Sequence, residues 1–323
     1  MKRQTSPEFA EQAYRAILRQ RMVDLLAGLA PEEGYNLSRL PEVRFLRSNR
    51  PLKATPVLYD PGIVIVCQGR KRGYFGDQVY LYDDQHYLAV SVPVPFTMET
   101  DASAVEPLLA IYLHLDVELA ADLMLELAQH GGLDDTAPAG MMSTPMDHRM
   151  AASVLRFLEV MGDPLQAAVL GPALVREVYF HVLAGAQGGA MRAALSLQGR
   201  FGKIARAIRR IHQSYAAALT VEQLAQESGM SVPSFHSHFR SVTRTSPLQY
   251  LKSTRLHQAR LLMVRNGMTA AAAGYAVGYG SPTQFSREFK RLFGSSPAEE
   301  ARRIKSGFAL PPAQANAAFV SSH

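Results

Sequence analysis

Residues 278–297 read GYGSPTQFSREFKRLFGSSP, and an earlier stretch, residues 229–247, reads GMSVPSFHSHFRSVTRTSP. The two stretches share one pattern. Ser231, Phe235, Phe239, Arg240 and Pro247 recur fifty positions later as Ser281, Phe285, Phe289, Lys290 and Pro297. The first glycines of the two stretches are forty-nine positions apart, so the second turn is one residue longer. The last third of the chain therefore repeats one small structural unit.

Each repeat has the composition of two short helices joined by a tight turn. Gly229 and Gly278 supply the turn. Where the two helices cross, a small residue is needed, and Ala225 and Gly274 occupy this position. The serine after each turn is suited to cap the next helix. In that second helix the two phenylalanines fall on one face and serve as core anchors. The pattern predicts two helix-turn-helix units.

The opposite face of each second helix carries polar side chains. Arg, Gln, Ser and Thr can hydrogen-bond to base edges, whereas Lys and Arg at a helix margin more often hold phosphates. For any single position, a solvated helix face is an equal alternative. The expected DNA-binding residues are Pro233, Ser234, His236, Ser237 and Arg240 in the first unit and Thr283, Gln284, Ser286, Arg287 and Lys290 in the second.

Charge is divided very unevenly along the chain. Residues 200–323 hold 17 Lys and Arg against 5 Asp and Glu, whereas residues 1–199 hold 17 against 23. A basic module of this size attracts a polyanion, and release of counterions from DNA is the usual source of affinity. We therefore expect double-stranded promoter DNA as the partner.

Length and composition limit the other possibilities. The 323 residues are enough for two domains, and 47% of them are hydrophobic, enough for sizeable cores. The single cysteine, Cys67, excludes an internal disulfide framework and a zinc site built from several thiolates. No run of about 18 apolar residues occurs, and the first ten residues lack an export signal. We expect a cytoplasmic protein with no membrane partner and no cofactor.

The N-terminal part begins with a predicted helix over 7–29 and then changes to short β-rich runs. Turn residues separate these runs, which suggests a small barrel or sandwich. Its predicted strands are 57–59, 63–68, 79–82, 87–92, 96–100 and 108–115, and its later helices are 117–129, 147–161 and 164–183. Residues 131–144 read as a loop, residues 185–189 as a break, and residues 309–323, without charge, as a loose tail.

The basic half resembles the DNA-binding domain of the AraC/XylS family, because residues 278–297 closely follow that family's signature. The resemblance implies seven helices, with a first one over about 200–216 and a long connecting helix over 247–265. It places the two recognition helices in successive major-groove segments on one DNA face. Gly274 departs from the family's usual Ala, which costs a helix about 1 kcal/mol.

The resemblance extends forward to an AraC-type N-terminal domain, carried by PVLYDPGI over 56–63, VCQGRK over 66–71 and YLAVSVPVP over 87–95. It implies a cupin-like β-fold, effector sensing, a homodimer and, for an activator, contact with RNA polymerase. The predicted fold class is thus a two-domain α+β chain. Its parts are a sensing and dimerisation domain over 1–190, with cupin-like strands over about 41–115 and helices over about 116–185, and an all-α DNA-binding domain over 200–308.

The predicted function is a sequence-specific transcription regulator, with activation favoured, under control of an unknown small molecule or electrophile. A non-covalent pocket inside the β-domain is the first hypothesis for sensing. The expected effector-binding residues are Tyr59, Cys67, Tyr74, Tyr87 and Met98. A reactive thiol is the second, because basic residues follow Cys67, although free cysteine usually packs as a small hydrophobe.

Three alternatives stay open. A cupin-type metalloenzyme fused to a DNA-binding module needs a histidine cluster, but His86 and His114 have no closely spaced histidine partner. An effector-independent DNA-binding protein would not need so large an N-terminal domain. In the helix over 164–183, the apolar set Leu165, Val169, Leu170, Leu174, Val178 and Leu183 fits either a core, which is favoured, or a dimer seam.

Overall fold

The computed structural model of the chain describes residues 7–130, 136–196 and 198–307. The strands are β1 (Gly34–Leu37), β2 (Val43–Ser48), β3 (Leu52–Tyr59), β4 (Gly62–Gln68), β5 (Arg70–Phe75), β6 (Gln78–Asp83), β7 (His86–Val90), β8 (Val94–Asp101), β9 (Leu108–His114) and β10 (Met141–Pro145). The helices are α1 (Pro7–Leu29), α2 (Val117–His130), α3 (His148–Met161), α4 (Pro164–Ala184), α5 (Gly188–Leu195), α6 (Gly199–Ser214), α7 (Val221–Glu227), α8 (Val232–Thr243), α9 (Pro247–Arg265), α10 (Ala270–Ala276), α11 (Pro282–Phe293) and α12 (Pro297–Gly307).

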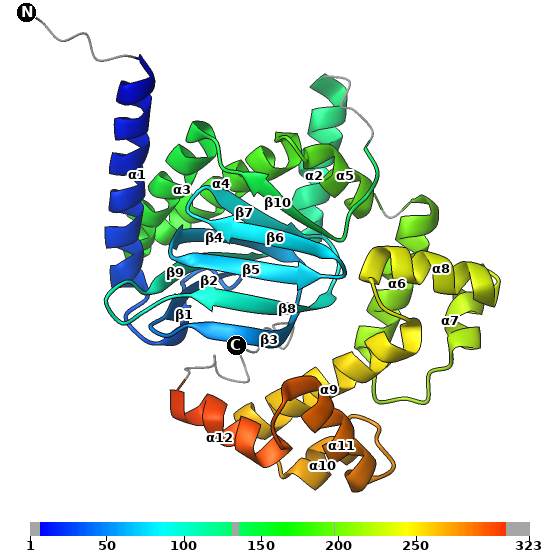
Figure 1. The fold of residues 1–323 in the computed structure, drawn as a ribbon. Coiled ribbons are helices and arrows are strands. Elements are labelled where there is room, and N and C mark those ends of the chain that lie inside the picture. The colour runs from blue at the N-terminus through cyan, green and yellow to red at the C-terminus, as the bar shows by residue number, and fades with distance from the viewer. Residues whose placement is uncertain (1–6, 131–135, 197, 308–323) are drawn as a thin grey trace, which may run out of the picture.

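The N-terminal half is one curled antiparallel sheet (Figure 1). Its strand order is β1-β2-β9-β4-β7-β6-β5-β8-β3, with β10 added beside β7. Because successive side chains of a strand point to opposite faces, each strand divides its residues between the two sides of the curl. Along β4, Val64 and Val66 face the interior, whereas Ile63, Ile65 and Cys67 face outward. The interior-facing set is called the barrel interior below.

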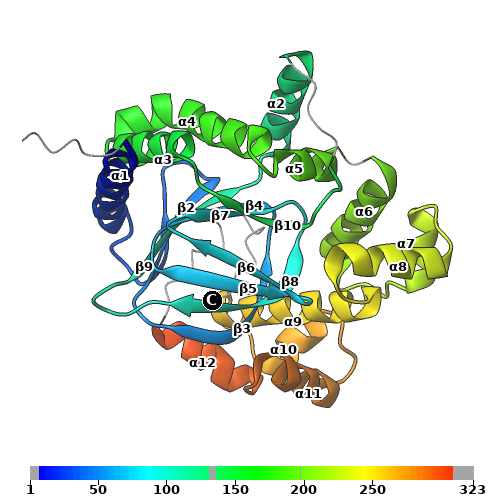
Figure 2. The same ribbon diagram turned by 45° about the horizontal axis from the view of Figure 1, so that its top comes forward.

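Helices α1, α3 and α4 cover the outer face of the sheet (Figure 2). Their buried apolar residues join those of the outer face in one core, which includes Leu26, Ile65 and Phe157. Helix α4 is the one described helix that is long and apolar enough to cross a membrane by length and composition. It packs against α3 in this core, and Gly171 of α4 leaves space for the side chain of Leu40. A core helix passes the same test of length and composition.

The C-terminal half has seven helices in its described residues, α6 to α12 (Figure 1). The long helix α9 runs between the pair α7–α8 and the pair α10–α11. Each pair turns at a glycine with positive φ, Gly229 at 59° and Gly278 at 91°. A Cβ on Gly278 would lie 2.4 Å from the carbonyl oxygen of Ala216, so only glycine fits there. The fold class predicted from the sequence is confirmed.

Several local expectations need correction. Strands β1, β2 and β5 were not predicted, and β10 overlaps the end of the expected loop over 131–144, where its backbone pairs with β7. Helix α5 begins within the expected break over 185–189. Ser281 caps α11 through the amide of Gln284, but Ser231 makes no side-chain cap hydrogen bond, since Pro233 removes one of the amides that it could accept from. The expected tail lies outside the described residues. The domain limits stay a prediction.

Candidate DNA-binding interface and effector site

The expected DNA-binding residues lie on two helices, α8 and α11, and nearly all of them face solvent. Nine of the ten side chains are exposed, and only Ser234 is half-buried, with its hydroxyl 3.3 Å from Nδ1 of His238. On the buried faces, Phe235 and Phe239 pack together in the first unit, as do Phe285 and Phe289 in the second. The aromatic anchors therefore fix which face of each helix is presented outward.

Arg255 of α9 helps to set the position of the helix pairs. The guanidinium of Arg255 donates to the carbonyls of Tyr215 at 2.7 Å, Ala217 at 2.8 Å and Gly278 at 3.3 Å. These contacts tie the residues after α6 to the turn of the second unit. Such a planar donor holds several carbonyls at once, so it fixes orientation as well as distance.

Glu288 is a buried acid within α11 that the sequence analysis did not single out. It accepts hydrogen bonds from Lys252 of α9 at 3.0 Å, from Tyr279 at 2.9 Å and from Gln284 at 3.2 Å. Although burial opposes it, these bonds lower the pKa of Glu288. The amide nitrogen of Gln284, an expected base reader, is thus already engaged within its own helix. The spacing of Gln284 and Glu288 by four residues was the available signal.

The turn between β5 and β6 lies against the exposed face of α8. Gly76 of this turn has a φ of 61°, and a Cβ there would lie 3.2 Å from Cγ of Arg244. Asp77 and Gln78 line one cavity of about 830 Å³ together with His236, Ser237, Arg240, Ser241, Arg244 and Ser246. Part of the expected DNA-reading face therefore shares a groove with the N-terminal half.

Hydrogen bonds also join the two halves. The phenol of Tyr250 donates to the carbonyl of Pro93 at 2.8 Å, and Nε2 of His212 lies 2.8 Å from the same phenol oxygen. Burial lowers the pKa of His212 to about 4, so its ring is neutral. Since the one phenol proton goes to Pro93, Nε2 of His212 carries the proton of the second bond.

A buried arginine of α9, Arg260, forms the second contact between the halves. Arg260 of α9 bonds to Glu300 at 3.2 Å and to the carbonyl of Pro56 in β3 at 3.1 Å. Its guanidinium also lies over the ring of Phe293, 4.1 Å from the centroid. The contact with Pro56 holds α9 and α12 against the sheet.

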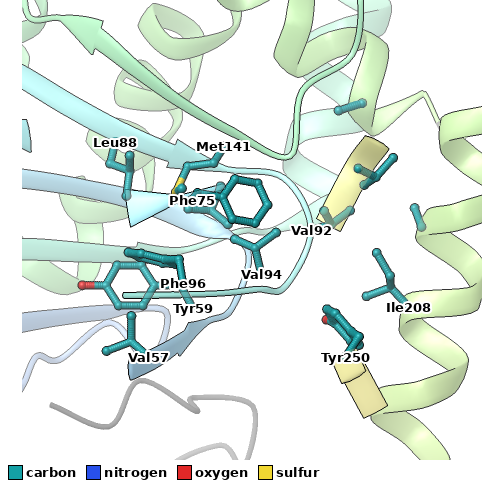
Figure 3. Packing of buried hydrophobic residues seen from close by; sticks show 14 of the residues in the cluster. Val57, Tyr59, Phe75, Leu88, Val92, Val94, Phe96, Met141, Ile208 and Tyr250 are labelled. Carbon is teal, nitrogen blue, oxygen red and sulfur yellow. The ribbon is translucent and has the colours of Figure 1, made fainter. Parts of the chain in front are cut away.

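One apolar core runs through the junction. Val92 and Val94, beside the strand end, lie between the barrel interior residues Tyr59 and Phe96 and the side chains of Ile208 and Tyr250 (Figure 3). A cavity of about 470 Å³ opens beside this core. Its lining includes Pro61, Val92, Pro93, Leu115, Leu195, Arg209 and His212. A small apolar ligand in this cavity would touch both halves.

Two of the expected effector-binding residues, Tyr59 and Met98, meet in the barrel interior. The phenol of Tyr59 donates to Sδ of Met98 at 3.5 Å. Lys71, which the sequence analysis did not single out, is 1% exposed and lies 3.0 Å from the same sulfur. The signal for Lys71 was weak, since a charged residue inside a strand usually faces water.

Family comparisons cover both halves of the chain. Residues 39–190 match the family described as AraC-type transcriptional regulator N-terminus, and residues 224–303 match a helix-turn-helix domain. The chain belongs to the AraC family of transcriptional regulators.

Curated relatives match part of this AraC-family chain. The RCS-specific HTH-type transcriptional activator RclR of Escherichia coli (strain K12) is 34% identical over 112 residues, which cover 35% of this chain and 38% of RclR. The HTH-type transcriptional regulator AlkR of Acinetobacter baylyi is 36% identical over 95 residues, 29% of this chain and 31% of AlkR. The matches thus span about a third of each relative.

Structures of ToxT from Vibrio cholerae strain SCE256 share the fold over most of the chain. An apo variant of ToxT has a TM-score of 0.55 at 11% identity and covers 84% of this chain and 99% of its own. Wild-type ToxT with bound unsaturated fatty acid has a TM-score of 0.54 at 11% identity and covers 86% of this chain and 100% of its own. At this identity the likeness concerns the fold.

The other expected effector residues of this AraC-family chain do not lie in the barrel interior. Tyr74 faces outward from β5 and donates to Glu99 at 2.7 Å. Tyr87 and Cys67 face the core beneath the helices. Cys67 is 1% exposed, and burial raises the pKa of its thiol to about 12, so the expected activation by the basic residues after it is not seen. The five residues therefore do not form one pocket.

The metalloenzyme alternative depends on a cluster of ligands. In residues 7–130, 136–196 and 198–307, no three His, Cys, Asp or Glu side chains gather in a way that could hold a metal ion. Nδ1 of His86 contacts Asp83 at 2.9 Å, and His114 lies on another strand, β9, beside the junction cavity. The described residues offer no ligand set for a metal.

Proposed function

We propose that this AraC-family chain binds promoter DNA by placing α8 and α11 in two successive major-groove segments, and that it activates transcription when an effector is present. The observation that carries the proposal is the pair of exposed polar helix faces fixed by one connecting helix, α9. A major groove about 12 Å wide admits one helix, and a rigid connector keeps two such helices on one DNA face. Activation is supported by the description of RclR as an activator.

The basic composition of the C-terminal half supplies the sequence-independent part of the affinity. Arg and Lys residues that neutralise phosphates release counterions, so binding weakens steeply as salt rises. Arg287 and Lys290 are exposed on α11, and Arg240 is exposed on α8. We infer that Arg287 reads bases and that the other two hold the backbone.

Control by an effector acts through the junction in this proposal. The turn Gly76–Gln78 shares a groove with α8. We infer that a duplex cannot enter this groove while the turn is there. The domains must therefore separate or rotate at α8 before that helix reaches DNA. An effector shifts this balance only by binding one arrangement better than the other.

The effector site lies in the N-terminal half or at its border, where the barrel interior and the junction cavity share one core. A ligand is present in one ToxT structure, an unsaturated fatty acid, and this supports effector binding by the same fold. The protein acts by binding rather than by catalysis in this account, and its place of action is the cytoplasm.

We place a homodimer contact on α4. Val178 and Leu183 of its apolar set are buried in the core, but Leu165 is 73% exposed and Val169 65% exposed. The helix therefore fits both interpretations of its pattern, with one face in the core and one face available. A dimer links two modules, which raises the affinity for paired sites.

Residues 200–308 expressed alone test the proposal. The fragment is expected to bind DNA with a steep salt dependence and without effector control, and the full chain to bind its promoter more tightly as a dimer. A folded fragment that binds no promoter DNA would contradict the account. A full chain whose footprint ignores every effector would favour the effector-independent alternative.

A further inference from the structure

Lys71 is a buried lysine for which the described residues supply no acidic partner. Its side chain points from β5 into the barrel interior and is 1% exposed. Nζ contacts Oγ1 of Thr100 at 3.2 Å and Sδ of Met98 at 3.0 Å. Among the described residues no carboxylate forms a salt bridge with it. Burial of an ammonium without a counter-charge is costly, so the barrel interior favours the neutral amine.

Hydroxyl groups surround the same point. The phenol oxygens of Tyr59 and Tyr82 lie 3.5 Å and 3.9 Å from Sδ of Met98, and Oγ1 of Thr100 lies 3.9 Å from it. The two phenol oxygens also lie 3.4 Å from each other. A thioether is a weak acceptor, so a carbonyl oxygen in its place would receive stronger hydrogen bonds from these hydroxyls. The carbon of that carbonyl is one that a neutral amine can attack.

The same physical cause acts in opposite directions on the two candidate nucleophiles. Burial disfavours the charged form of any group. It therefore suppresses the thiolate of Cys67, whose pKa rises to about 12, and releases the free amine of Lys71, whose pKa falls to about 7. Desolvated lysines are the amines that form Schiff bases in proteins. Of these two side chains, Lys71 is therefore the better nucleophile toward an electrophile.

We propose that Lys71 is the attachment site of a small aldehyde effector, which it holds as an imine in the barrel interior. The proposal rests on the effector control proposed above and names its chemical class. The attack forms a C–N bond from Nζ to the carbonyl carbon and gives a carbinolamine. Loss of the oxygen, which leaves as water with the two amine hydrogens, breaks the C–O bond and gives the imine. No oxidant or reductant takes part.

The neighbouring side chains have distinct parts in this step. The hydroxyls of Tyr59, Tyr82 and Thr100 donate to the carbonyl oxygen and then assist its departure as water. Met98 has a flexible side chain and makes room by changing rotamer. Because the core is close-packed and continues through Val92 and Val94 to Tyr250 (Figure 3), added atoms at Lys71 disturb the junction. The adduct is thereby coupled to α9, which carries Tyr250.

Reductive trapping tests the proposal directly. The full chain at about pH 7 is treated with butanal and cyanoborohydride, and the modified peptides are mapped by mass spectrometry. Butanoate and butan-1-ol serve as probes of equal length without a reactive carbonyl. Fewer than about one in a thousand ordinary lysine side chains are free amines at this pH, so we expect roughly tenfold or more labelling of Lys71 over the exposed Lys53 and Lys290. Equal labelling of all lysines overturns the proposal.

The variant Lys71→Met separates the chemistry from the fold. It fills similar volume without the amine and is expected to fold, to bind promoter DNA as the untreated wild type does, and to lose any shift of DNA affinity caused by butanal. Lys53→Met is the matched control and keeps the shift. If wild-type protein is stabilised against heat by butanoate but forms no butanal adduct, the site binds an anion and the imine is wrong. If neither protein binds DNA at all, the proposed function fails, whereas the mapped adduct still decides the chemistry at Lys71.

Discussion

The phenol of Tyr250 donates a 2.8 Å hydrogen bond to the backbone carbonyl of Pro93, which joins α9 to the residues just before β8. The two residues are 157 positions apart, and the same phenol accepts from His212 of α6. One buried side chain thus connects both halves of the protein at the point where the apolar core crosses between them.

Tyr250→Phe is expected to lower the free energy of unfolding by about 1–3 kcal/mol, because the carbonyl of Pro93 and Nε2 of His212 lose their partner in a buried place. Urea unfolding followed by circular dichroism measures the change. Tyr275→Phe is the control, since Tyr275 is 58% exposed. An equal effect of both variants would show that the contact with Pro93 contributes nothing.

Arg287→Ala is expected to weaken binding to the cognate site by about 1–3 kcal/mol and to relax the base preference at one position. Competition binding with single-base operator variants measures both effects. Arg302→Ala removes an exposed arginine from α12, outside α11, and should change affinity little and preference not at all. A uniform loss across all operator variants would instead make Arg287 a phosphate contact.

The sequence predicted the helices best where their ends carry clear signals. Helices α1 and α9 have the predicted bounds, and α9 begins with Pro247 in its first turn behind the cap of Ser246. Strand β5 was missed because it reads Arg-Lys-Arg-Gly at its start, and a charged run normally lies in solvent. Only the curled sheet of the folded chain shows that Lys71 faces inward.

The expected effector-binding residues show what the sequence cannot predict about a strand, namely which of its two faces points to the interior. Side chains alternate along a strand, so a shift of one position moves a residue to the other face. In β5, Lys71 and Phe75 face the interior and Tyr74 faces outward, and in β7, Leu88 faces the interior and Tyr87 outward. The sequence predicted β7 but not β5, and it could not decide which face of a strand is the interior. The contact of the β5–β6 turn with α8 is tertiary and had no local signal.

Asp77→Lys is expected to raise DNA affinity by about fivefold or more in the absence of effector, because a cation at the turn is repelled by Arg240 and Arg244 and moves the turn away from α8. Fluorescence anisotropy with promoter DNA measures the affinity. Glu106→Lys makes the same change of charge in the exposed loop between β8 and β9 and controls for general attraction to DNA. An equal gain in DNA affinity in both variants would show that the turn does not control DNA binding.

The buried amine of Lys71 predicts a pH dependence of stability. Its pKa is about 7 in the folded protein against about 10.4 for an unfolded lysine, so the unfolded chain binds more protons between these values and stability rises with pH. Between about pH 7 and 8.5 the slope is up to about 1.4 kcal/mol per pH unit. Lys71→Met should be more stable than wild type at pH 7, and the difference should shrink toward pH 8.5. A constant difference over this range contradicts a neutralised lysine.

Val169→Glu is expected to dissociate the proposed homodimer, because it places a charge on the exposed apolar face of α4. Sedimentation velocity measures the change in mass. Val105→Glu, at the 96% exposed Val105, is the matched control and should leave the dimer intact. A dimer that survives Val169→Glu must use another surface.

Footprinting of the purified full chain on a promoter found by a genome-wide binding map tests the central claim most directly. The account predicts two protected major-groove segments about one helical turn, roughly 34 Å, apart on one DNA face for each module. Arg240→Ala should weaken protection of one segment and Arg287→Ala protection of the other. Protection of a single segment, or protection that neither variant changes, would contradict the account.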